Sequence, residues 1–154
     1  MQVDLLNSQV LWVGIGCQKG TSGKLVSVAI EKILRDTQFT YSAIAGIATI
    51  ASKASEMGLR EFCQVHNFPL KTFTAEILAG VNVPNPAKII AQIVGTPSVA
   101  EASAILAAME ISSQARLLVP KQIFRLPEEA GVVTVAIAVT STIPNDLQST
   151  ILKK

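Results

Sequence analysis

The stretch Val10-Leu-Trp-Val-Gly-Ile-Gly-Cys-Gln-Lys-Gly-Thr-Ser-Gly-Lys24 decides the fold. Its apolar first half is typical of a buried strand, and its glycines are typical of a tight turn. Thr21 or Ser22 can then cap a helix, because a hydroxyl oxygen accepts a hydrogen bond from a free N–H group of the first helical turn. The stretch therefore predicts a strand, a glycine-rich turn and a helix in direct succession.

This turn is also a candidate anion-binding site. Glycine lets the backbone approach a ligand closely, and the N–H groups at the start of a helix attract negative charge. A lysine adds a mobile cation. Besides Gly14, the residues that we expect to contact a ligand here are Gly16, Lys19, Gly20, Thr21 and Ser22.

Known nucleotide-binding motifs fit the turn poorly. A dinucleotide-binding fingerprint has glycine at its first, third and sixth places, but the sixth place counted from Gly14 is Lys19. A P-loop has Gly-Lys followed by Ser or Thr, whereas Gly20 is followed directly by Thr21. Nucleotide binding is therefore a weaker alternative, and a strand-to-helix turn without a ligand also explains the glycines.

Length and composition favour one α/β unit. The chain has 154 residues, of which 49% are hydrophobic and 5% aromatic, so its core is built mainly from small aliphatic side chains. We expect a single domain over residues 1–154, with a core at about 10–139 and a loose tail at 140–154. The net charge of +2 is small, and the lysines are scattered along the sequence. Both observations argue against nucleic acid as a partner.

Metal and membrane functions find little support in the sequence. Cys17 and Cys63 stand apart, and His66 is the single histidine, so the usual zinc ligands are missing and no metal site is expected. The apolar runs are shorter than the ~20 residues that cross a bilayer. The N-terminus lacks the features of a signal peptide. We therefore expect no membrane association and a cytoplasmic location.

Strands and helices alternate along most of the chain. The apolar patterns predict strands at 45–50 and 70–73, and a closing hairpin of 116–119 and 132–139 joined by 121–131. They predict helices at 21–36, 56–67, 75–80, 87–94 and 102–109. This order indicates a three-layer α/β/α sandwich around a mixed, mostly parallel sheet of about five strands.

The first two strands direct attention to one edge of that sheet. If they are parallel neighbours, their carboxyl ends bring residues 19–22 and 52–56 to the same rim, where ligands of α/β proteins collect. Lys53 at this rim is a candidate contact for a carboxylate or a lactone, and Glu56 is a candidate general base. A solvated loop lysine and a carboxylate in the first turn of a helix are the simpler explanations.

Four further residues also have simple structural explanations. Ser98 and Glu101 have the spacing of a capping box, in which each side chain bonds the backbone N–H of the other residue. Cys17 follows the first strand beside the lysine of the turn, but without a histidine partner we interpret it as a small packed side chain. His66 falls in helical register with Phe62 and Leu59, which favours packing over catalysis.

Several segments, taken in order, resemble one protein family. They are Gly14-Ile-Gly-Cys-Gln-Lys-Gly-Thr-Ser22, Leu59 with the preceding Lys53 and Glu56, Val83-Pro-Asn-Pro86, Gly95-Thr-Pro-Ser-Val-Ala-Glu-Ala102, Leu117-Leu-Val-Pro-Lys121 and Val133-Thr-Val-Ala-Ile-Ala138. Together they resemble the C-terminal domain of the cobalamin-biosynthesis protein CbiG and its free-standing relative CobE. The resemblance runs from about residue 10 to residue 138.

The resemblance implies a role in corrin synthesis. CbiG opens the lactone of a cobalt-precorrin, which then loses a two-carbon fragment as acetaldehyde. By this resemblance we expect a precorrin or cobalt-precorrin ligand, with cobalt as part of the substrate and no resident cofactor. Other pathway enzymes, or a separate chain with the N-terminal domains of CbiG, are the expected protein partners.

Two readings of the activity stay open at this point. The chain is either a component of the hydrolase or a non-catalytic module that binds or assembles corrinoids. The expected catalytic residues are Lys53 and Glu56. The expected substrate contacts are Gly16, Lys19, Gly20, Thr21, Ser22, Thr96, Ser98 and Lys121.

Overall fold

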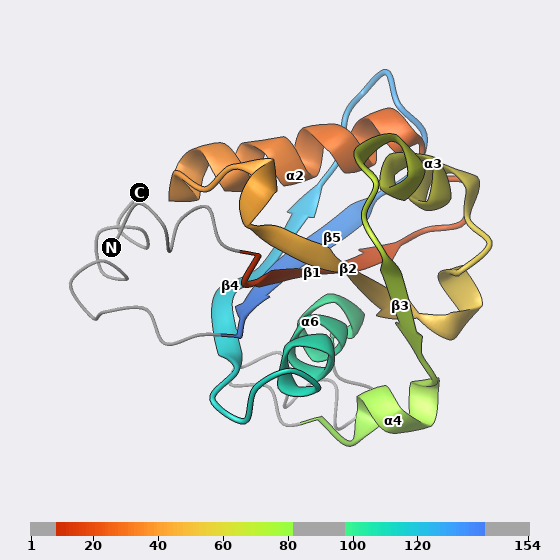
Figure 1. Ribbon diagram of the computed structural model, residues 1–154. Helices are drawn as coiled ribbons and strands as arrows, with labels where there is room; N and C mark the ends of the chain where they lie inside the picture. The colour runs from red at the N-terminus through yellow and green to blue at the C-terminus, as the bar shows by residue number, and fades with distance from the viewer. Residues whose placement is uncertain (1–8, 82–97, 141–154) are drawn as a thin grey trace.

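A five-stranded sheet forms the centre of the molecule (Figure 1). The computed structural model describes residues 9–81 and 98–140. Within these residues the strands lie in the order β3-β2-β1-β5-β4. Their bounds are Leu11–Cys17 for β1, Ile44–Ile50 for β2, Leu70–Phe73 for β3, Arg116–Phe124 for β4 and Val133–Val139 for β5.

The sheet is mixed, as the sequence predicts. β1 pairs in parallel with β2, and β2 pairs in parallel with β3. β5 runs antiparallel to both of its neighbours, β1 and β4. Four of the strands therefore point in one direction and β5 points in the other, because the closing hairpin returns the chain beside β1.

Helices cover both faces of the sheet (Figure 1). α2 (Gly23–Thr37) and α3 (Met57–His66) lie on one face, and α6 (Val99–Met109) and the short α4 (Ala75–Ala79) lie on the other. Single 3-10 turns at Tyr41–Ala43 and Ala51–Lys53 flank β2. The expected three-layer α/β/α sandwich is therefore confirmed.

The two faces of the sheet bury different kinds of side chain. Under α2 and α3 the core is made mostly of large aliphatic residues, such as Ile15, Leu25 and Ile47. Under α6 it is made largely of alanine together with Trp12 and Ile105. Large side chains hold the first pair of helices away from the sheet, whereas alanines bring α6 close to it.

The predicted elements need three corrections or limits. β4 continues to Phe124, so Lys121 lies in an edge strand and not in the hairpin connection that the charged sequence suggested. Thr140, expected to begin a loose tail, is buried, and its N–H donates to the carbonyl of Val10 at 2.9 Å. The predicted helix at 87–94 and the rest of the tail lie outside the described residues.

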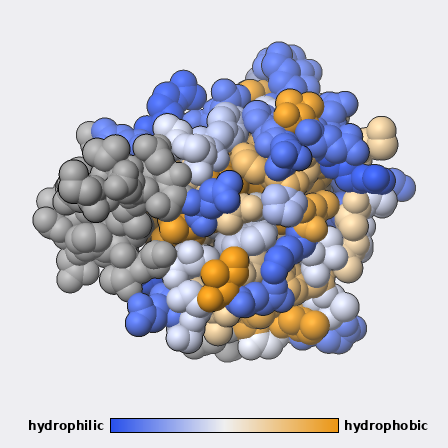
Figure 2. All heavy atoms as spheres, in the orientation of Figure 1, coloured by the Kyte–Doolittle hydropathy of each residue, from blue (hydrophilic) through white to orange (hydrophobic). Residues whose placement is uncertain are grey.

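The surface shown in Figure 2 mixes hydrophilic and hydrophobic side chains. On the described part of this face, hydrophobic side chains stand between hydrophilic ones and form no broad continuous patch. Among the helices in residues 9–81 and 98–140, each is too short or too polar to span a lipid bilayer.

Candidate functional site

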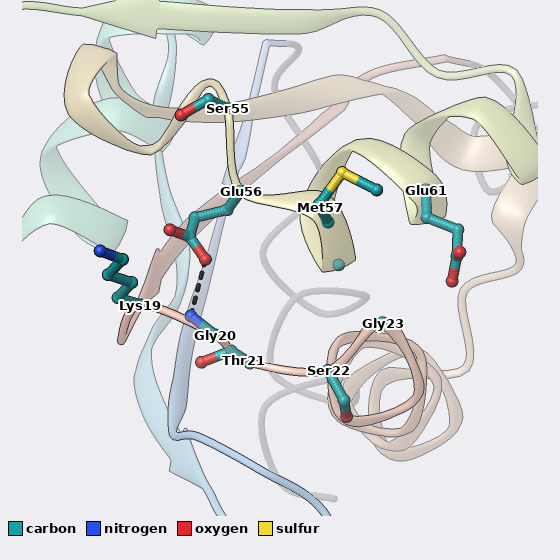
Figure 3. A pocket seen from close by; sticks show the side chains of 10 residues that line it. Lys19, Gly20, Thr21, Ser22, Gly23, Ser55, Glu56, Met57 and Glu61 are labelled. Atoms are coloured by element: carbon teal, nitrogen blue, oxygen red, sulfur yellow. Dashed lines mark hydrogen bonds between the residues drawn. The ribbon is translucent and has the colours of Figure 1, made fainter.

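A crevice of about 480 Å³ opens where the starts of α2 and α3 meet the turn after β1 (Figure 3). The carboxyl ends of β1 and β2 direct both connecting loops to this edge, since the two strands are parallel neighbours. The predicted rim therefore forms, although not from every expected residue. The lining residues are Lys19, Gly20, Thr21, Ser22, Gly23, Ser55, Glu56, Met57, Gly58 and Glu61.

One hydrogen bond joins the two loops of the crevice. The backbone N–H of Gly20 donates to Oε1 of Glu56 at 2.8 Å, across 36 positions of sequence (Figure 3). Gly20 has φ of +83°, a conformation that residues with a side chain rarely adopt. Glycine at this position thus lets the turn direct its N–H toward the loop before α3.

The starts of two helices lie together beside this bond. The Oγ of Ser22 accepts from the N–H of Leu25 at 3.0 Å, so Ser22 is the residue that caps α2. Gly58 in the first turn of α3 packs directly on the backbone of Thr21 and Gly23, where a β-carbon would overlap the carbonyl oxygen of Thr21. The positive ends of both helix dipoles therefore act on the crevice.

Thr21 has a structural role in the turn. Only 4% of it is exposed, and its Oγ1 donates to the carbonyls of Gln18 at 2.7 Å and Val132 at 3.2 Å. The N–H of Gln18 donates to the same Val132 carbonyl, and the N–H of Ser22 donates to the carbonyl of Ala130. The connection between β4 and β5 therefore holds the turn, and the hydroxyl of Thr21 faces protein carbonyls.

The two lysines predicted for the rim occupy different places. Lys19 lines the crevice, whereas Lys53 is half-buried and is not part of its lining. The charges of Lys53 and Glu56 nevertheless both act on Cys17 at the end of β1. All three residues thus lie at the same end of the sheet, with the ammonium group of Lys53 outside the crevice.

Cys17 and His66 are packing residues, as the sequence suggests. Burial raises the pKa of the Cys17 thiol; the positive charge of Lys53 acts in the opposite direction, and the negative charge of Glu56 acts in the same direction as burial. His66 stacks on Tyr41 with ring centroids 4.5 Å apart, and Phe62 and Phe68 complete the aromatic cluster. This cluster lies at the far end of α3 from the crevice.

A second group of predicted ligand contacts lies on the α6 side of the sheet. A β-carbon placed on Gly16 would lie 3.7 Å from the β-carbon of Val99, the first residue of α6. Ser98 caps that helix through the N–H of Glu101. The N–H of Lys121 donates to Oε2 of Glu101 at 3.0 Å. These residues do not line the crevice, and Thr96 lies outside the described residues.

Sequence reasoning missed two features of the site. Gly58 permits the contact between the two helix starts, and glycine in the first turn of a helix was the available signal. Glu101 is fully buried, and its carboxylate joins α6 to β4. The capping-box spacing concealed this link, because it explained the carboxylate by a purely local bond.

The described residues give no sign of a metal centre. Within residues 9–81 and 98–140, no three side chains from His, Cys, Asp and Glu group closely enough to hold an ion. The crevice instead offers backbone N–H groups, hydroxyls and the ammonium group of Lys19, beside the carboxylates of Glu56 and Glu61. These donors suit an anion of moderate size.

The fold and the crevice define an α/β protein in which two helix starts line a crevice at one edge of the sheet. The model of the family described as Cobalamin synthesis G C-terminus matches residues 11–138. The chain belongs to this family, and it therefore has a role in cobalamin biosynthesis. The resemblance identified in the sequence is confirmed.

Individual relatives agree with this assignment. Cobalt-precorrin-5A hydrolase of Priestia megaterium is 28% identical over 102 residues, which is 66% of this chain and 27% of that protein's length. The crystal structure of CobE, a protein from the cobalamin (vitamin B12) biosynthetic pathway, superposes with a TM-score of 0.70. That match has 25% identity and covers 88% of this chain and 93% of CobE.

A second crystal structure gives a similar result. It is the cobalamin biosynthesis protein chiG from Agrobacterium tumefaciens, with 32% identity and a TM-score of 0.61. The match covers 86% of this chain and all of that chain. Proteins of about the extent of the described fold thus occur among the solved relatives.

Proposed function

We propose that the crevice binds a precorrin or cobalt-precorrin through the carboxylates at the edge of the macrocycle. The observation that supports this most directly is the bond between Gly20 and Glu56, because it brings two helix starts and Lys19 to one opening. Backbone N–H groups at helix starts and an ammonium group all favour carboxylates. Family membership supports the pathway, and the geometry of the crevice supports this position for the ligand.

Several carboxylates have to be engaged at the same time. One exposed ion pair contributes only about 0.2–1 kcal/mol, since water screens it and the side chains lose freedom. Lys19 is exposed, so its own contribution falls in this range. A precorrin has many acidic side chains, and contacts at Lys19 and at the helix starts add to one another.

The proposed activity is a part in opening the cobalt-precorrin lactone, with later release of acetaldehyde. In this role Glu56 accepts a proton from the water that adds to the lactone carbonyl. Lys19 stabilises the negative charge that develops on the carbonyl oxygen, whereas Lys53, which was expected to act on the lactone, lies outside the lining. The name of the Priestia megaterium relative supports the reaction class.

The test of this activity is direct. The pure chain is incubated with the lactone-bearing cobalt-precorrin, and acetaldehyde is measured with an alcohol dehydrogenase assay. The proposed base is supported if activity falls strongly in Glu56→Gln and remains in Glu61→Gln. The second variant removes another carboxylate of the same lining. No product above the protein-free control, while a full-length relative is active, excludes catalysis by this chain alone.

A non-catalytic module for binding or assembling corrinoids is the second candidate. It is favoured by two observations: Lys53 lies outside the crevice lining, and the matched part is 27% of the hydrolase from Priestia megaterium. In this case the catalytic groups belong to another chain, such as one that contains the N-terminal domains of CbiG. Adding that chain restores acetaldehyde release if this candidate is correct.

Binding itself is tested separately from catalysis. Cobyrinic acid, a corrin with free carboxylic acids, raises the melting temperature of the chain if it binds only the folded state. We expect Lys19→Ala to weaken this binding roughly two- to fivefold with little change in stability. Lys24→Ala is the matched control, because Lys24 is exposed on α2 and does not line this crevice. A flat titration for the wild type contradicts both candidates.

A further inference from the structure

We infer that Glu56 occupies the position of a ligand carboxylate and that a substrate carboxylate displaces it from the N–H of Gly20. Glu56 would then be a specificity-determining residue that sets how many carboxylates a ligand needs. This inference rests on the proposed binding of a polycarboxylate in the crevice. It adds a step that the lining residues alone do not imply.

The N–H of Gly20 is the donor best placed for an anion, and the protein's own carboxylate already uses it. The bond is 2.8 Å long and exposed to solvent. Among the described residues, no atom lies within 4 Å of the place where a β-carbon of Gly20 would stand, so the turn is open on that side. A ligand can therefore reach the same N–H without rearranging the core.

Glu56 directs its side chain away from its own helix. It is the N-cap residue of α3, a position where short polar side chains usually accept a bond from the first helical turn. Its side chain makes no such cap bond and extends to Gly20 instead. The first N–H groups of α3 thus receive no cap from Glu56, while the neighbouring loop receives a carboxylate.

The surrounding charges explain why this arrangement selects ligands. Glu56 and Glu61 both line the crevice, with Lys19 as a cation of the lining (Figure 3). A ligand with a single carboxylate exchanges one carboxylate bond at Gly20 for another and gains little. A ligand with several carboxylates also reaches Lys19 and the start of α3. These extra contacts let it displace the carboxylate of Glu56 from the N–H of Gly20.

The experiment follows the Gly20 amide by ¹⁵N NMR during titration with tricarballylate, a small tricarboxylate. In Glu56→Ala we expect the dissociation constant reported by this amide to fall about fivefold relative to the wild type. Glu61→Ala is the matched control, since it removes a carboxylate of the same crevice that is not bonded to Gly20; we expect a change within about twofold.

Glu56→Gln provides a second variant that keeps an acceptor for Gly20 and removes the charge. It should bind more tightly than the wild type and less tightly than Glu56→Ala. Unchanged or weaker binding in both Glu56 variants overturns the inference, as does an equal gain in Glu61→Ala. A parallel titration with cobyrinic acid separates the two ideas: if no variant binds it, the proposed function fails, and the tricarballylate result still decides the role of Glu56.

Discussion

The two faces of the sheet show opposite solutions to packing. On the α6 face, alanines and Gly14 bring helix and sheet so close that a β-carbon at Gly14 would overlap the carbonyl oxygen of Ala100. On the α2 and α3 face, large aliphatic side chains fill the core, and the two helix starts leave a crevice at its edge. One face is closed by backbone contact, and the other ends in an opening.

This difference changes how the glycine-rich turn is understood. The sequence predicts that Gly14, Gly16 and Gly20 form one group that lets a ligand approach the backbone. In the structure the first two face α6, and Gly20 alone among these three has positive φ beside the crevice. A single sequence motif thus contains packing glycines followed by one conformational glycine.

The largest expected effect comes from disrupting the close contact between α6 and the sheet at Gly14. Gly14→Ala should lower the free energy of unfolding by about 3 kcal/mol, because the new methyl group meets backbone that cannot rotate away. Urea denaturation measures this change. Gly16→Ala is the control, because its nearest neighbour is the β-carbon of Val99 at 3.7 Å, an ordinary contact. Equal losses in both variants would show that the approach of α6 is not the cause.

A second substitution tests the contact between the helix starts. Gly58→Ala should lower the free energy of unfolding by about 1–2 kcal/mol, since overlap with the carbonyl of Thr21 outweighs the better helix propensity of alanine. Thermal unfolding measures the loss, and the Gly20 amide shift reports whether the crevice changes shape. Gly80→Ala is the control, because the nearest atom there is the Ile77 carbonyl at 3.6 Å. Increased stability of Gly58→Ala would contradict a tight contact.

The caps on the two faces give a smaller effect. Ser22→Ala should cost about 1 kcal/mol of stability, because the N–H of Leu25 loses its partner at 3.0 Å. Ser98→Ala removes the corresponding bond of α6, which is longer at 3.4 Å, and should cost less. Denaturation of the two variants side by side measures the difference. The reverse order would mean that the α6 cap is the more important of the two.

The smallest effect at neutral pH comes from the buried thiol of Cys63 on α3. Burial raises the pKa of Cys63 from 9.0 to about 11, so the folded state keeps the proton through a range in which the unfolded state releases it. The contribution of the protonated Cys63 thiol to stability is therefore complete below pH 9.0 and is lost as the pH rises toward about 11. Cys63→Ala should show a shallower loss of stability in this range. An identical pH slope in wild type and variant would refute this.

Much of the fold was predictable because its signals are local. The strand predicted at 45–50 is apolar except for Thr49, and the one at 70–73 lies between a proline and a capping threonine, so both strands were placed to within a residue. The extension of β4 through Lys121 was missed, since polar and proline residues there are typical of a connection. An edge strand tolerates them because, among the residues that the structure describes, one side of it has no partner strand.

The site was predictable only in outline. Parallel strands bring the two loops to one edge, so the meeting of Lys19 and Glu56 at the crevice followed from the strand order. The sequence did not indicate that Glu56 bonds Gly20 or that Lys53 lies outside the lining. The approach of the two loops depends on the close packing of Gly58 against the turn, and a glycine in the first turn of a helix does not by itself reveal which backbone it contacts.

The hydrogen bonds between the turn and the connection from β4 to β5 affect the entropy cost of ligand binding. Thr21 bonds the carbonyl of Val132, 111 positions away, and Gln18 and Ser22 bond the same connection through their N–H groups. The turn is thus already ordered before an anion arrives. Binding at this edge therefore avoids the entropy cost of ordering a loop. Individually weak contacts can then add up to a measurable affinity.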